Sequence, residues 1–337
     1  MTVLVSASGA PGTAALLRSL RENGERDVRL VGTDMSERSV GRHLCDVFHL
    51  VPAGSDTGFP DAILQVVERE GVDVVLPQSS FDLEGLAAHR ERFPVPVLVS
   101  RPDTIHRSND KAETYAFLHR IGAPAPEFRR VNGAAEVDAA ARELGYPDRA
   151  VCFKPVFSSG SRGFRVLDPT VDRAHQLLHE RPGSVAMRLE EAVELLPDAG
   201  GPDLLVMELA TGDERTIDGI ADGRRVVLGH AKTREAMRAG LAMYFVTLDE
   251  PELMALADRI VSELAIEWFF NIQLVGDHVI EINPRISTIV YQEDLNLPYL
   301  GVKRALGEIS DDALEGLRDR IRPGRTALRY FDQLEWG

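Results

Sequence analysis

The sequence predicts an α/β protein whose first third forms a doubly wound parallel sheet. Over residues 1–105, apolar strand-like runs alternate with amphipathic helical patterns, which is typical of successive β-α-β units. Later strand patterns follow one another more closely, and the Asp-Gly pair at 222–223 predicts a hairpin turn between two of them. These observations indicate three parts, at residues 1–105, 106–205 and 206–337.

Each strand and helix predicted in the first part has its own apolar pattern in the sequence. Residues 2–6 (TVLVS) form a short apolar run, and a Gly-rich turn separates this run from a helical pattern at 13–23. That pattern repeats its apolar residues at helical spacing, with Ala14, Leu16, Leu17 and Leu20 as the set. The remaining strands are predicted at 28–33, 72–76 and 95–99, and the remaining helices at 59–70 and 82–92.

The later elements are predicted in the same way. A helix at 110–121 carries Lys111 and ends before the stretch 122–126. The strands predicted after it are 151–156, 164–167, 204–209, 215–220, 225–230, 268–275 and 279–282. The helices predicted after it are 173–180, 187–196, 251–265 and 311–320.

Composition narrows the possible functions. The chain has 337 residues and a net charge of −15, so it repels nucleic-acid phosphates and we expect no nucleic-acid partner. Two cysteines alone favour a reducing compartment over a disulfide framework. The sequence lacks a signal-peptide pattern and any run of about 18 apolar residues, so we expect a cytoplasmic protein with no membrane partner.

The turn SASGAPG at 6–12 lies between the first strand and the first helix. It could cradle a phosphate at the helix N-terminus, and Asp34 follows the second strand as in dinucleotide-binding folds. However, Ala7 stands where the Gly-x-Gly-x-x-Gly pattern needs its first glycine. A tight turn that packs the helix on the sheet is therefore the favoured interpretation.

The stretch VCFKPVFSSGSRGFRV at 151–166 places Lys154 on a strand, with a Gly/Ser loop directly after it. Backbone N–H groups of such a loop can approach phosphate oxygens, and the lysine supplies a positive charge. An ordinary surface hairpin is the alternative, and these residues alone favour neither interpretation.

The stretch VMELATGDE at 206–214 brings an apolar strand to Glu208 and then to Glu214. Backbone groups at a strand end can read the edge of an adenine, and a carboxylate can accept hydrogen bonds from ribose hydroxyls. A strand that ends in a solvated acidic turn is the alternative, and it is favoured when this stretch is taken alone.

The most specific pattern is VIEINPRIST at 279–288. Glu281, Asn283 and Arg285 alternate, so their side chains share one face of an extended segment. Together with Gln273, Glu281 and Asn283 form a set of oxygen ligands suited to Mg²⁺, with Mn²⁺ as an alternative metal.

The loop of this hairpin decides whether the ligands share a face. A three-residue loop at 276–278 would pair Gln273 with Glu281, whereas a two-residue turn would put them on opposite faces. We expect the three-residue loop, since such loops with glycine are common. An exposed polar strand edge is the alternative, but it explains poorly why Asn-Pro-Arg follows Glu281 within an apolar run.

The stretch HAKTREAMRAGLAMYF at 230–245 carries Lys232, Arg234 and Arg238. These cations could clamp a carboxylate substrate, because arginine binds carboxylates through two hydrogen bonds. A solvated lid helix is the equal alternative. His230 is interpreted as a structural residue, and Cys152, inside a strand, as a packing residue rather than a nucleophile.

Taken in order, Lys111, FKPVFSSGSRG, MELATGDE and Gln273 with EINPR resemble the ATP-grasp superfamily. The similarity is closest to its carbamoyl-phosphate-synthase-like branch of carboxylate–amine ligases, and it covers nearly the whole chain. The resemblance implies that a Rossmann-like pre-ATP-grasp domain precedes a two-lobed α+β ATP-grasp fold. The middle part would then be a linker helix with a small lid subdomain, and the last part would carry the metal-binding hairpin.

The resemblance also implies roles for matching residues. Lys111 and Lys154 would contact ATP phosphates, and Arg285 would stabilise the transferred phosphoryl group, with Lys154 and Arg234 completing the catalytic set. The loop over the phosphates would use Ser158, Ser159, Gly160, Ser161 and Gly163; the adenine would be held by Glu208, Leu209 and Ala210, and the ribose by Glu214. Gln273, Glu281 and Asn283 would bind two Mg²⁺ ions.

The expected reaction joins a carboxylic acid to an amine through an acyl phosphate, with release of ADP and phosphate. The expected partners are therefore a small-molecule carboxylate and an amine, and a homodimer is one open arrangement because dimers are common for such folds. Two alternatives stay open. The acceptor could be a thiol or a phosphoryl acceptor, or the N-terminal sheet could serve an NAD(P)-dependent oxidoreductase or a nucleotide sensor.

Overall fold

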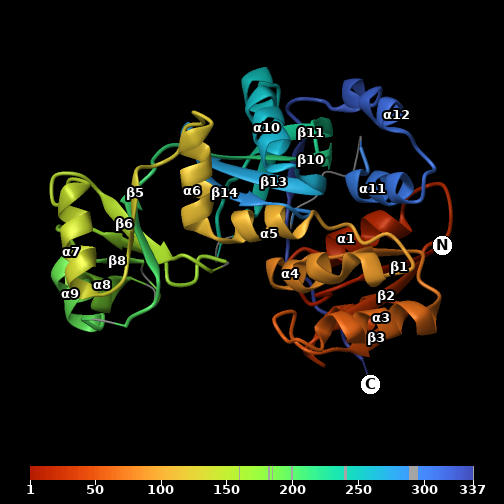
Figure 1. The fold of residues 1–337 in the computed structure, drawn as a ribbon, viewed down its shortest axis with the longest axis horizontal. Coiled ribbons are helices and arrows are strands. Elements are labelled where there is room, and N and C mark those ends of the chain that lie inside the picture. Colours follow the sequence, from red (N-terminus) through yellow and green to blue (C-terminus); the bar gives the residue numbers. More distant parts are fainter. Residues whose placement is uncertain are drawn as a thin grey trace. The chain divides into compact units, whose positions relative to one another are not determined.

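The computed structural model describes residues 1–158, 160–180, 183, 185–198, 200–238, 241–287 and 295–336. The chain forms two compact units (Figure 1). The first unit comprises Met1–Ser108, Glu214–Gln273 and Ile282–Gly337, and the second comprises Asn109–Asp213 and Leu274–Glu281. The three-part division at 1–105, 106–205 and 206–337 stays a prediction. In the described part of the chain, no helix combines the length and the apolar character needed to cross a membrane.

The first unit begins with the predicted parallel sheet, which confirms the α/β class of this part. Its strands run in the order β3-β2-β1-β4, and all three pairings between neighbouring strands are parallel. The strands are β1 (Thr2–Val5), β2 (Arg29–Asp34), β3 (Val47–Leu50) and β4 (Val74–Leu76). The helices are α1 (Thr13–Arg21), α2 (Gly41–Leu44), α3 (Phe59–Glu70), α4 (Ser80–His89) with the 3-10 turn Arg90–Arg92, and α5 (Pro102–Asn109).

The strand predicted at 95–99 is wrong. This segment makes only an isolated bridge, between Val75 and Val97. Pro94 and Pro96 have no backbone N–H, so a regular ladder cannot continue past them. The sequence analysis also missed β3 and α2, which are only four residues long each.

The rest of the first unit is built on a six-stranded sheet in the order β14-β13-β10-β11-β12-β15. Its strands are β10 (Glu214–Asp222), β11 (Val226–Thr233), β12 (Tyr244–Leu248), β13 (Glu267–Val275), β14 (His278–Asn283) and β15 (Thr326–Leu328), and the tip of the β13–β14 hairpin belongs to the second unit. The helices are α10 (Pro251–Leu264), α11 (Leu297–Ala305) and α12 (Asp311–Glu315), followed by the 3-10 turn Arg318–Arg320. Strands β12 and β15 and helix α11 were not predicted.

The two faces of this sheet have different partners. On one face, the glycines of β10 and β11 leave room for neighbours: a Cβ at Gly229 would lie 3.0 Å from the Met254 side chain of α10. On the opposite face, Leu228, Phe245 and Phe269 join a core shared with α1 and α11. This second face carries apolar residues in one region and charged residues, described below, in another, and we call it the polar face. Its apolar residues pack with the N-terminal sheet, so the two sheets belong to one unit.

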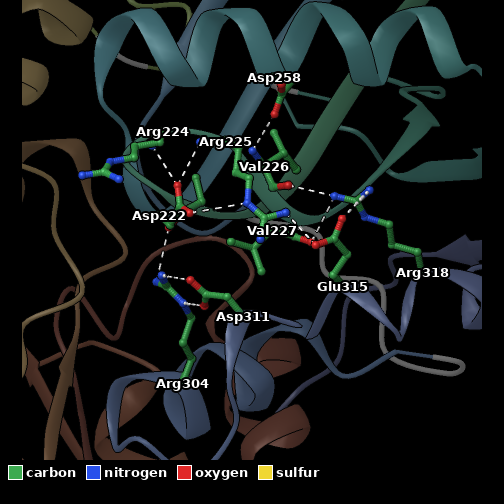
Figure 2. Close-up of polar contacts among 11 residues, drawn as sticks. Asp222, Arg224, Arg225, Val226, Val227, Asp258, Arg304, Asp311, Glu315 and Arg318 are labelled. Carbon is green, nitrogen blue, oxygen red and sulfur yellow. Dashed lines mark hydrogen bonds and ion pairs between the residues drawn. The ribbon is translucent and has the colours of Figure 1, made fainter. Parts of the chain in front are cut away.

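The turn between β10 and β11 is fastened to the C-terminal segment by ion pairs (Figure 2). Arg225 contacts Glu315 at 2.6 Å and also lies 3.7 Å from Asp222. Arg304 contacts Asp311 at 2.5 Å, and the Arg304 side chain also donates to a backbone carbonyl of β10. These contacts hold α11 and α12 against the sheet. None of the residues that make them is a predicted site residue.

The second unit contains a five-stranded sheet in the order β5-β9-β6-β7-β8. Its strands are β5 (Phe128–Val131), β6 (Val151–Pro155), β7 (Arg165–Leu167), β8 (Ala186–Met187) and β9 (Leu204–Glu208). Its helices are α6 (Lys111–Arg120), α7 (Ala134–Glu143), α8 (Arg173–His179) and α9 (Leu189–Leu195). A core of its own lies between this sheet and helices α7 and α9. Strands β5 and β8 and helix α7 were not predicted.

Candidate active site

The second unit holds Lys154 in a defined position on β6. Its ammonium group donates a 2.9 Å hydrogen bond to the Tyr115 hydroxyl and lies 5.1 Å from the centroid of that ring. The Tyr115 hydroxyl donates in turn to the Ile280 carbonyl at 2.7 Å. Burial lowers the pKa of Lys154, whereas the carboxylate of Glu281 raises it. The sequence-predicted lysine is therefore pre-oriented by helix α6 and strand β14.

Lys111 begins helix α6, directly after its N-cap. The Asp110 side chain caps the helix by accepting from the Glu113 N–H at 3.0 Å, which fixes the position of the first turn. The Lys111 ammonium donates to the Ser158 carbonyl in the Gly/Ser loop. Burial lowers the pKa of Lys111 to about 8; the charge of Glu281 raises it and that of Lys154 lowers it. Both predicted phosphate-binding lysines thus lie close enough to Glu281 to feel its charge.

The Gly/Ser loop has the backbone freedom that its predicted role needs. Gly160, Ser161 and Gly163 all have positive φ angles, of 62°, 58° and 74°. A side chain at Gly163 would also collide with the Pro155 ring, 2.7 Å from the position of a Cβ atom. Ser158 donates from its hydroxyl to the Pro155 carbonyl at 3.3 Å. The predicted Ser159 lies outside the described residues.

The predicted adenine contacts lie at the end of β9. The Glu208 carboxylate accepts from Arg149 at 3.1 Å and from the Glu127 N–H at 3.3 Å. The Leu209 N–H donates to the Ala150 carbonyl at 3.2 Å, so this donor is engaged within the sheet. Adenine binding by Glu208, Leu209 and Ala210 therefore stays a prediction. The Leu209 N–H already donates to the Ala150 carbonyl.

The first unit contains two predicted metal ligands, Gln273 and Asn283, that donate hydrogen bonds to the same residue. Asn271, on β13, is buried, and its carbonyl oxygen accepts from the amide nitrogens of Gln273 at 2.9 Å and Asn283 at 3.3 Å. The Asn271 amide nitrogen donates to Thr216 at 2.5 Å and Asp218 at 2.7 Å. Four hydrogen bonds thus fix Asn271, and Asn271 fixes how both neighbouring amides are turned.

This arrangement fits a cation site by its donor set. With their nitrogens held by Asn271, both amides turn their oxygens toward positive charge: Gln273 accepts from Arg234 at 2.6 Å, and Asn283 accepts from Arg285 at 3.2 Å. Amide and carboxylate oxygens are the ligands that Mg²⁺ prefers. Alternation along β14 puts Glu281 on the same face of that strand as Asn283. The residues present therefore suit the metal that the sequence predicted.

The loop of the metal hairpin is shorter than predicted. Strand β13 ends at Val275 and β14 begins at His278, so the turn contains two residues, Gly276 and Asp277, rather than three. Gly276 adopts a φ of 52°, and a Cβ there would lie 2.5 Å from the Thr211 carbonyl. A hydrogen bond of 3.3 Å between the side chains of Asn271 and Asn283 nevertheless joins the two strands.

Two ion pairs lie side by side across β10 and β11 on the polar face. Lys232 contacts Asp218 at 2.6 Å with both side chains buried, and Arg234 contacts Glu214 at 3.1 Å. In the described residues of this segment, 230–238 and 241–245, strand β11 runs to Thr233 and isolated bridges join Glu235 to Tyr244 and Arg238 to Leu241, so these residues do not form the lid helix that was the alternative interpretation. Burial and the charge of Lys232 lower the pKa of His230 to about 4, in agreement with a structural role.

Arg285 connects the metal hairpin to the N-terminal sheet. Its Nε donates to the Ser80 hydroxyl at 3.0 Å, at the start of α4. The guanidinium also donates to the Ile286 carbonyl at 3.0 Å. Arg285 is therefore held at the start of α4, just after the carboxyl end of β4.

The N-terminal turn is a tight turn, and Asp34 is part of it. The Gly9 N–H donates to the Asp34 carboxylate at 2.7 Å, and the Ser36 N–H donates to the same group at 2.9 Å. A Cβ at Gly9 would lie only 2.9 Å from that carboxylate, so the turn requires glycine. These contacts favour the packing interpretation over a ribose-binding Asp34.

Both cysteines are free and poorly suited to nucleophilic chemistry. Burial raises the pKa of Cys45 and of Cys152 to about 12, although the charge of Lys154 opposes the shift at Cys152. Because the thiolate is the reactive form, neither thiol is activated at neutral pH.

Two family models match parts of this chain. A family model described as "ATP-grasp in the biosynthetic pathway with Ter operon" matches residues 201–322, and a model described as "PylC-like, N-terminal domain" matches residues 3–98. The first match contains Glu208, Glu214, Gln273, Glu281, Asn283 and Arg285.

Solved structures share the fold across most of the chain. The L-amino acid ligase from Bacillus licheniformis is 17% identical with a TM-score of 0.64, covering 96% of this chain and 78% of that one. N5-carboxyaminoimidazole synthetase from Staphylococcus aureus, complexed with ADP, is 15% identical with a TM-score of 0.61, covering 85% and 70%. The chain belongs to the ATP-grasp superfamily.

A third relative of this ATP-grasp protein was solved with a metal–nucleotide complex. The biotin carboxylase domain dimer of the Hydrogenobacter thermophilus 2-oxoglutarate carboxylase is described in complex with MgADP, ADP and bicarbonate. It is 17% identical with a TM-score of 0.66, covering 96% of this chain and 73% of that one.

Two residues of this ATP-grasp protein escaped the sequence analysis although their positions carry a signal. Asn271 alternates with Gln273 along β13, so the same period-two pattern that selected Glu281 and Asn283 could have selected it. Tyr115 lies one helical turn after Lys111 on α6, which places both on the same side of that helix. The sequence analysis considered neither residue, because Asn271 lies outside the EINPR pattern and tyrosine is not a usual phosphate or metal ligand.

Proposed function

We propose that this ATP-grasp protein is an ATP-dependent carboxylate–amine ligase. An oxygen of the substrate carboxylate attacks the γ-phosphorus of ATP, the bond from that phosphorus to the β–γ bridging oxygen breaks, and ADP leaves. An amine nitrogen then attacks the acyl carbon, the carbon–oxygen bond to phosphate breaks, and the amine loses a proton. The products are an amide, ADP and phosphate.

One observation carries the proposal: Lys111 and Lys154 gather near Glu281 in a chain of net charge −15. Burial and mutual repulsion both disfavour two neighbouring ammonium groups, so the arrangement is understandable if a polyanion binds there. A triphosphate is such a polyanion. A module for neutral ligands would gain nothing from keeping both lysines charged and partly dehydrated.

The chain's own residues then act mainly by positioning and charge. Lys154, oriented by Tyr115, and Lys111 would bind phosphate oxygens, while the 158–163 loop would cover them and exclude water from the acyl phosphate. Arg285 and Arg234 would stabilise the transferred phosphoryl group and the acid.

The remaining predicted site residues would hold the nucleotide and the metal in this proposal. Gln273, Glu281 and Asn283 would hold Mg²⁺ or Mn²⁺, which when bound neutralises phosphate charge. Glu208, Leu209 and Ala210 would bind the adenine, and Glu214 the ribose. Ser158, Ser159, Gly160, Ser161 and Gly163 would form the phosphate loop.

An ADP-release screen tests this function. Carboxylic acids are supplied singly and in pairs with amino acids or other amines, together with MgATP. The proposal predicts ADP and phosphate in equal amounts only when both an acid and an amine are present. A phosphorylated product that accumulates without an amine would indicate a phosphotransferase, and a product with coenzyme-type thiols would indicate a thiol ligase.

A homodimer is also proposed, because one relative of the same fold is described as a dimer. Sedimentation velocity at micromolar concentration gives the mass directly. A species near twice the 37.1 kDa chain mass supports the dimer, and a species at the chain mass excludes it.

A further inference from the structure

Two buried acceptors on β10 determine which way the amide of Asn271 is turned. The Asn271 Nδ2 atom lies 2.5 Å from the Thr216 hydroxyl and 2.7 Å from the Asp218 carboxylate, and all three residues are buried. The hydroxyl donates its one proton to the Ile272 carbonyl at 3.1 Å, so it accepts from Asn271. A carboxylate can only accept. Both partners therefore require the nitrogen of Asn271 on their side and leave its oxygen on the other.

Lys232 keeps Asp218 in its charged form. The ammonium and the carboxylate lie 2.6 Å apart, and 1% of the lysine side chain and 3% of the aspartate side chain are exposed. A buried carboxyl group without a neighbouring cation favours its protonated form, which can donate as well as accept. The ammonium also lies 4.7 Å from the centroid of the Phe245 ring. The ion pair therefore stabilises the form of Asp218 that can only accept.

The direction of the Asn271 amide determines the direction of two predicted metal ligands. Its oxygen accepts from the amide nitrogens of Gln273 at 2.9 Å and Asn283 at 3.3 Å. If Asn271 were turned over, its nitrogen would face these two nitrogens, and both side chains would have to turn as well. Their N–H groups would then take the places of the oxygens that suit Mg²⁺.

Arg234 and Arg285 also contact these two amides. Arg234 donates to the Gln273 oxygen at 2.6 Å, and Arg285 donates to the Asn283 oxygen at 3.2 Å. In the proposed function, however, both guanidinium groups bind the acid and the transferred phosphoryl group. Asn271 is buried and has no part in binding the substrate, so its contacts are the ones that keep the amides turned during the reaction.

We propose that Asp218, held by Lys232, is a positioning residue for the metal. It turns Asn271, whose oxygen then turns the two neighbouring amide ligands so that their oxygens face the cation. This inference rests on the proposed function, because it takes its metal ligands from there. Asp218 itself contacts neither the metal nor the substrate. Groups that orient metal ligands in this way commonly change metal affinity by about 10-fold to 100-fold when they are replaced.

Calorimetric titration of the full-length protein with ADP tests the inference. Each protein is titrated twice, once with Mn²⁺ and once with EDTA. The unmodified protein should bind ADP more tightly with Mn²⁺, because the bound metal neutralises phosphate charge. A positioning role for the metal changes only the titration with Mn²⁺, whereas a general effect on the fold changes both.

The variant to be tested removes both charges of the ion pair together. Asp218→Asn alone would leave the Lys232 charge buried without its partner, which is strongly destabilising, so Asp218→Asn is combined with Lys232→Met. The new amide can present either its nitrogen or its oxygen to Asn271 and no longer sets its direction. We expect the ADP affinity of this double variant to fall about tenfold with Mn²⁺ and to stay unchanged with EDTA. A melting curve shows that the variant is folded.

Two further variants complete the test. Thr216→Val removes the other acceptor but keeps the side-chain shape, and it should lower the affinity with Mn²⁺ by a smaller factor, about threefold. Arg304→Met with Asp311→Asn removes an ion pair of the same unit whose side chains are 15% and 32% exposed, and it should leave both affinities unchanged.

Three results would overturn the inference. The first is a folded double variant, or Thr216→Val, that binds ADP with Mn²⁺ as tightly as the unmodified protein. The second is an affinity that falls equally with Mn²⁺ and with EDTA. The third is an unmodified protein that gains nothing from Mn²⁺, which would overturn the metal assignment as well. The titrations need no acid, amine or turnover, so a failed ligase screen leaves their result standing.

Discussion

Lys154 donates a 2.9 Å hydrogen bond to the hydroxyl of Tyr115, and the same ammonium lies over the Tyr115 ring. The Tyr115 hydroxyl in turn donates a 2.7 Å hydrogen bond to the Ile280 carbonyl. One buried tyrosine therefore links a helix, a strand of the five-stranded sheet and the metal hairpin within the second unit. Lys154 reaches its position through this linkage rather than through an ion pair.

Tyr115→Phe should weaken ATP binding. The variant keeps the ring but loses the hydroxyl, so Lys154 loses its orienting partner, and we expect KM for ATP to rise about tenfold. Losing the hydrogen bonds should lower the free energy of unfolding by about 1 kcal/mol. Steady-state kinetics and urea unfolding measure the two effects. Tyr146→Phe, at another buried tyrosine of this unit, is the control, and an unchanged KM in Tyr115→Phe would contradict the positioning role.

Glu281→Ala should abolish ATP turnover while leaving the fold intact. Glu281 is the one carboxylate in the predicted metal set, and its charge also raises the pKa of Lys111 and Lys154. We expect a loss of roughly a hundredfold or more in ADP release, with an unchanged melting curve. Glu263→Gln, at an exposed glutamate, should behave like the unmodified protein. Normal ATP turnover by Glu281→Ala would show that the metal assignment is wrong.

ATP affinity should fall as the pH rises through 8. The pKa of Lys111 is lowered by burial to about 8, so the ammonium form that binds phosphate dominates below that pH and disappears above it. Between pH 7 and pH 9 its population falls about tenfold, and the affinity for ATP should fall by a similar factor. Fluorescence titration with an ATP analogue measures this. Lys111→Arg stays charged and should show a flat profile; an equally steep profile in that variant would assign the titration to another group.

Asp82 should make the fold less stable as the pH rises from 4 to 7. Burial raises the pKa of this carboxyl to about 6, although Ser6 opposes the shift by donating a 2.6 Å hydrogen bond to it. The folded state therefore binds a proton that the unfolded state has already released, and stability is lost as the pH rises through 6. The full shift corresponds to roughly 3 kcal/mol, of which about 2 kcal/mol is lost between pH 4.5 and 7.5. Urea unfolding at pH 4.5 and 7.5 should show this loss in the unmodified protein but not in Asp82→Asn, and equal pH dependence in both would contradict it.

Strands could be predicted from the sequence where the local pattern of apolar residues agrees with the tertiary structure. Alternating apolar runs predicted the parallel N-terminal sheet, and the hairpin motif predicted β13 and β14 to within one residue at each end. The segment 95–99 failed because its apolar residues are interleaved with Pro94 and Pro96, which cannot donate to a ladder. Strand β5 (FRRV) was missed because two of its four residues are charged, and these make ion pairs that are visible only in three dimensions.

The candidate site shows the same division. Glu281 and Asn283 follow from alternation along one strand, which any single sequence displays. The contact of Arg285 with Ser80 does not, because the two residues are 205 positions apart in the sequence. Asn271 could be predicted only in part. Its position follows the same alternation along β13 as Gln273, but three of its four hydrogen bonds are made with residues of β10 and β14.

Transfer of ¹⁸O from the substrate acid to phosphate tests the central claim most directly. An acid labelled in both carboxylate oxygens is incubated with MgATP and an amine, and the released phosphate is analysed by mass spectrometry. Because the carboxylate oxygen attacks the γ-phosphorus and leaves with it, each phosphate should contain one labelled oxygen. Unlabelled phosphate, or AMP and pyrophosphate in place of ADP, would contradict activation through an acyl phosphate.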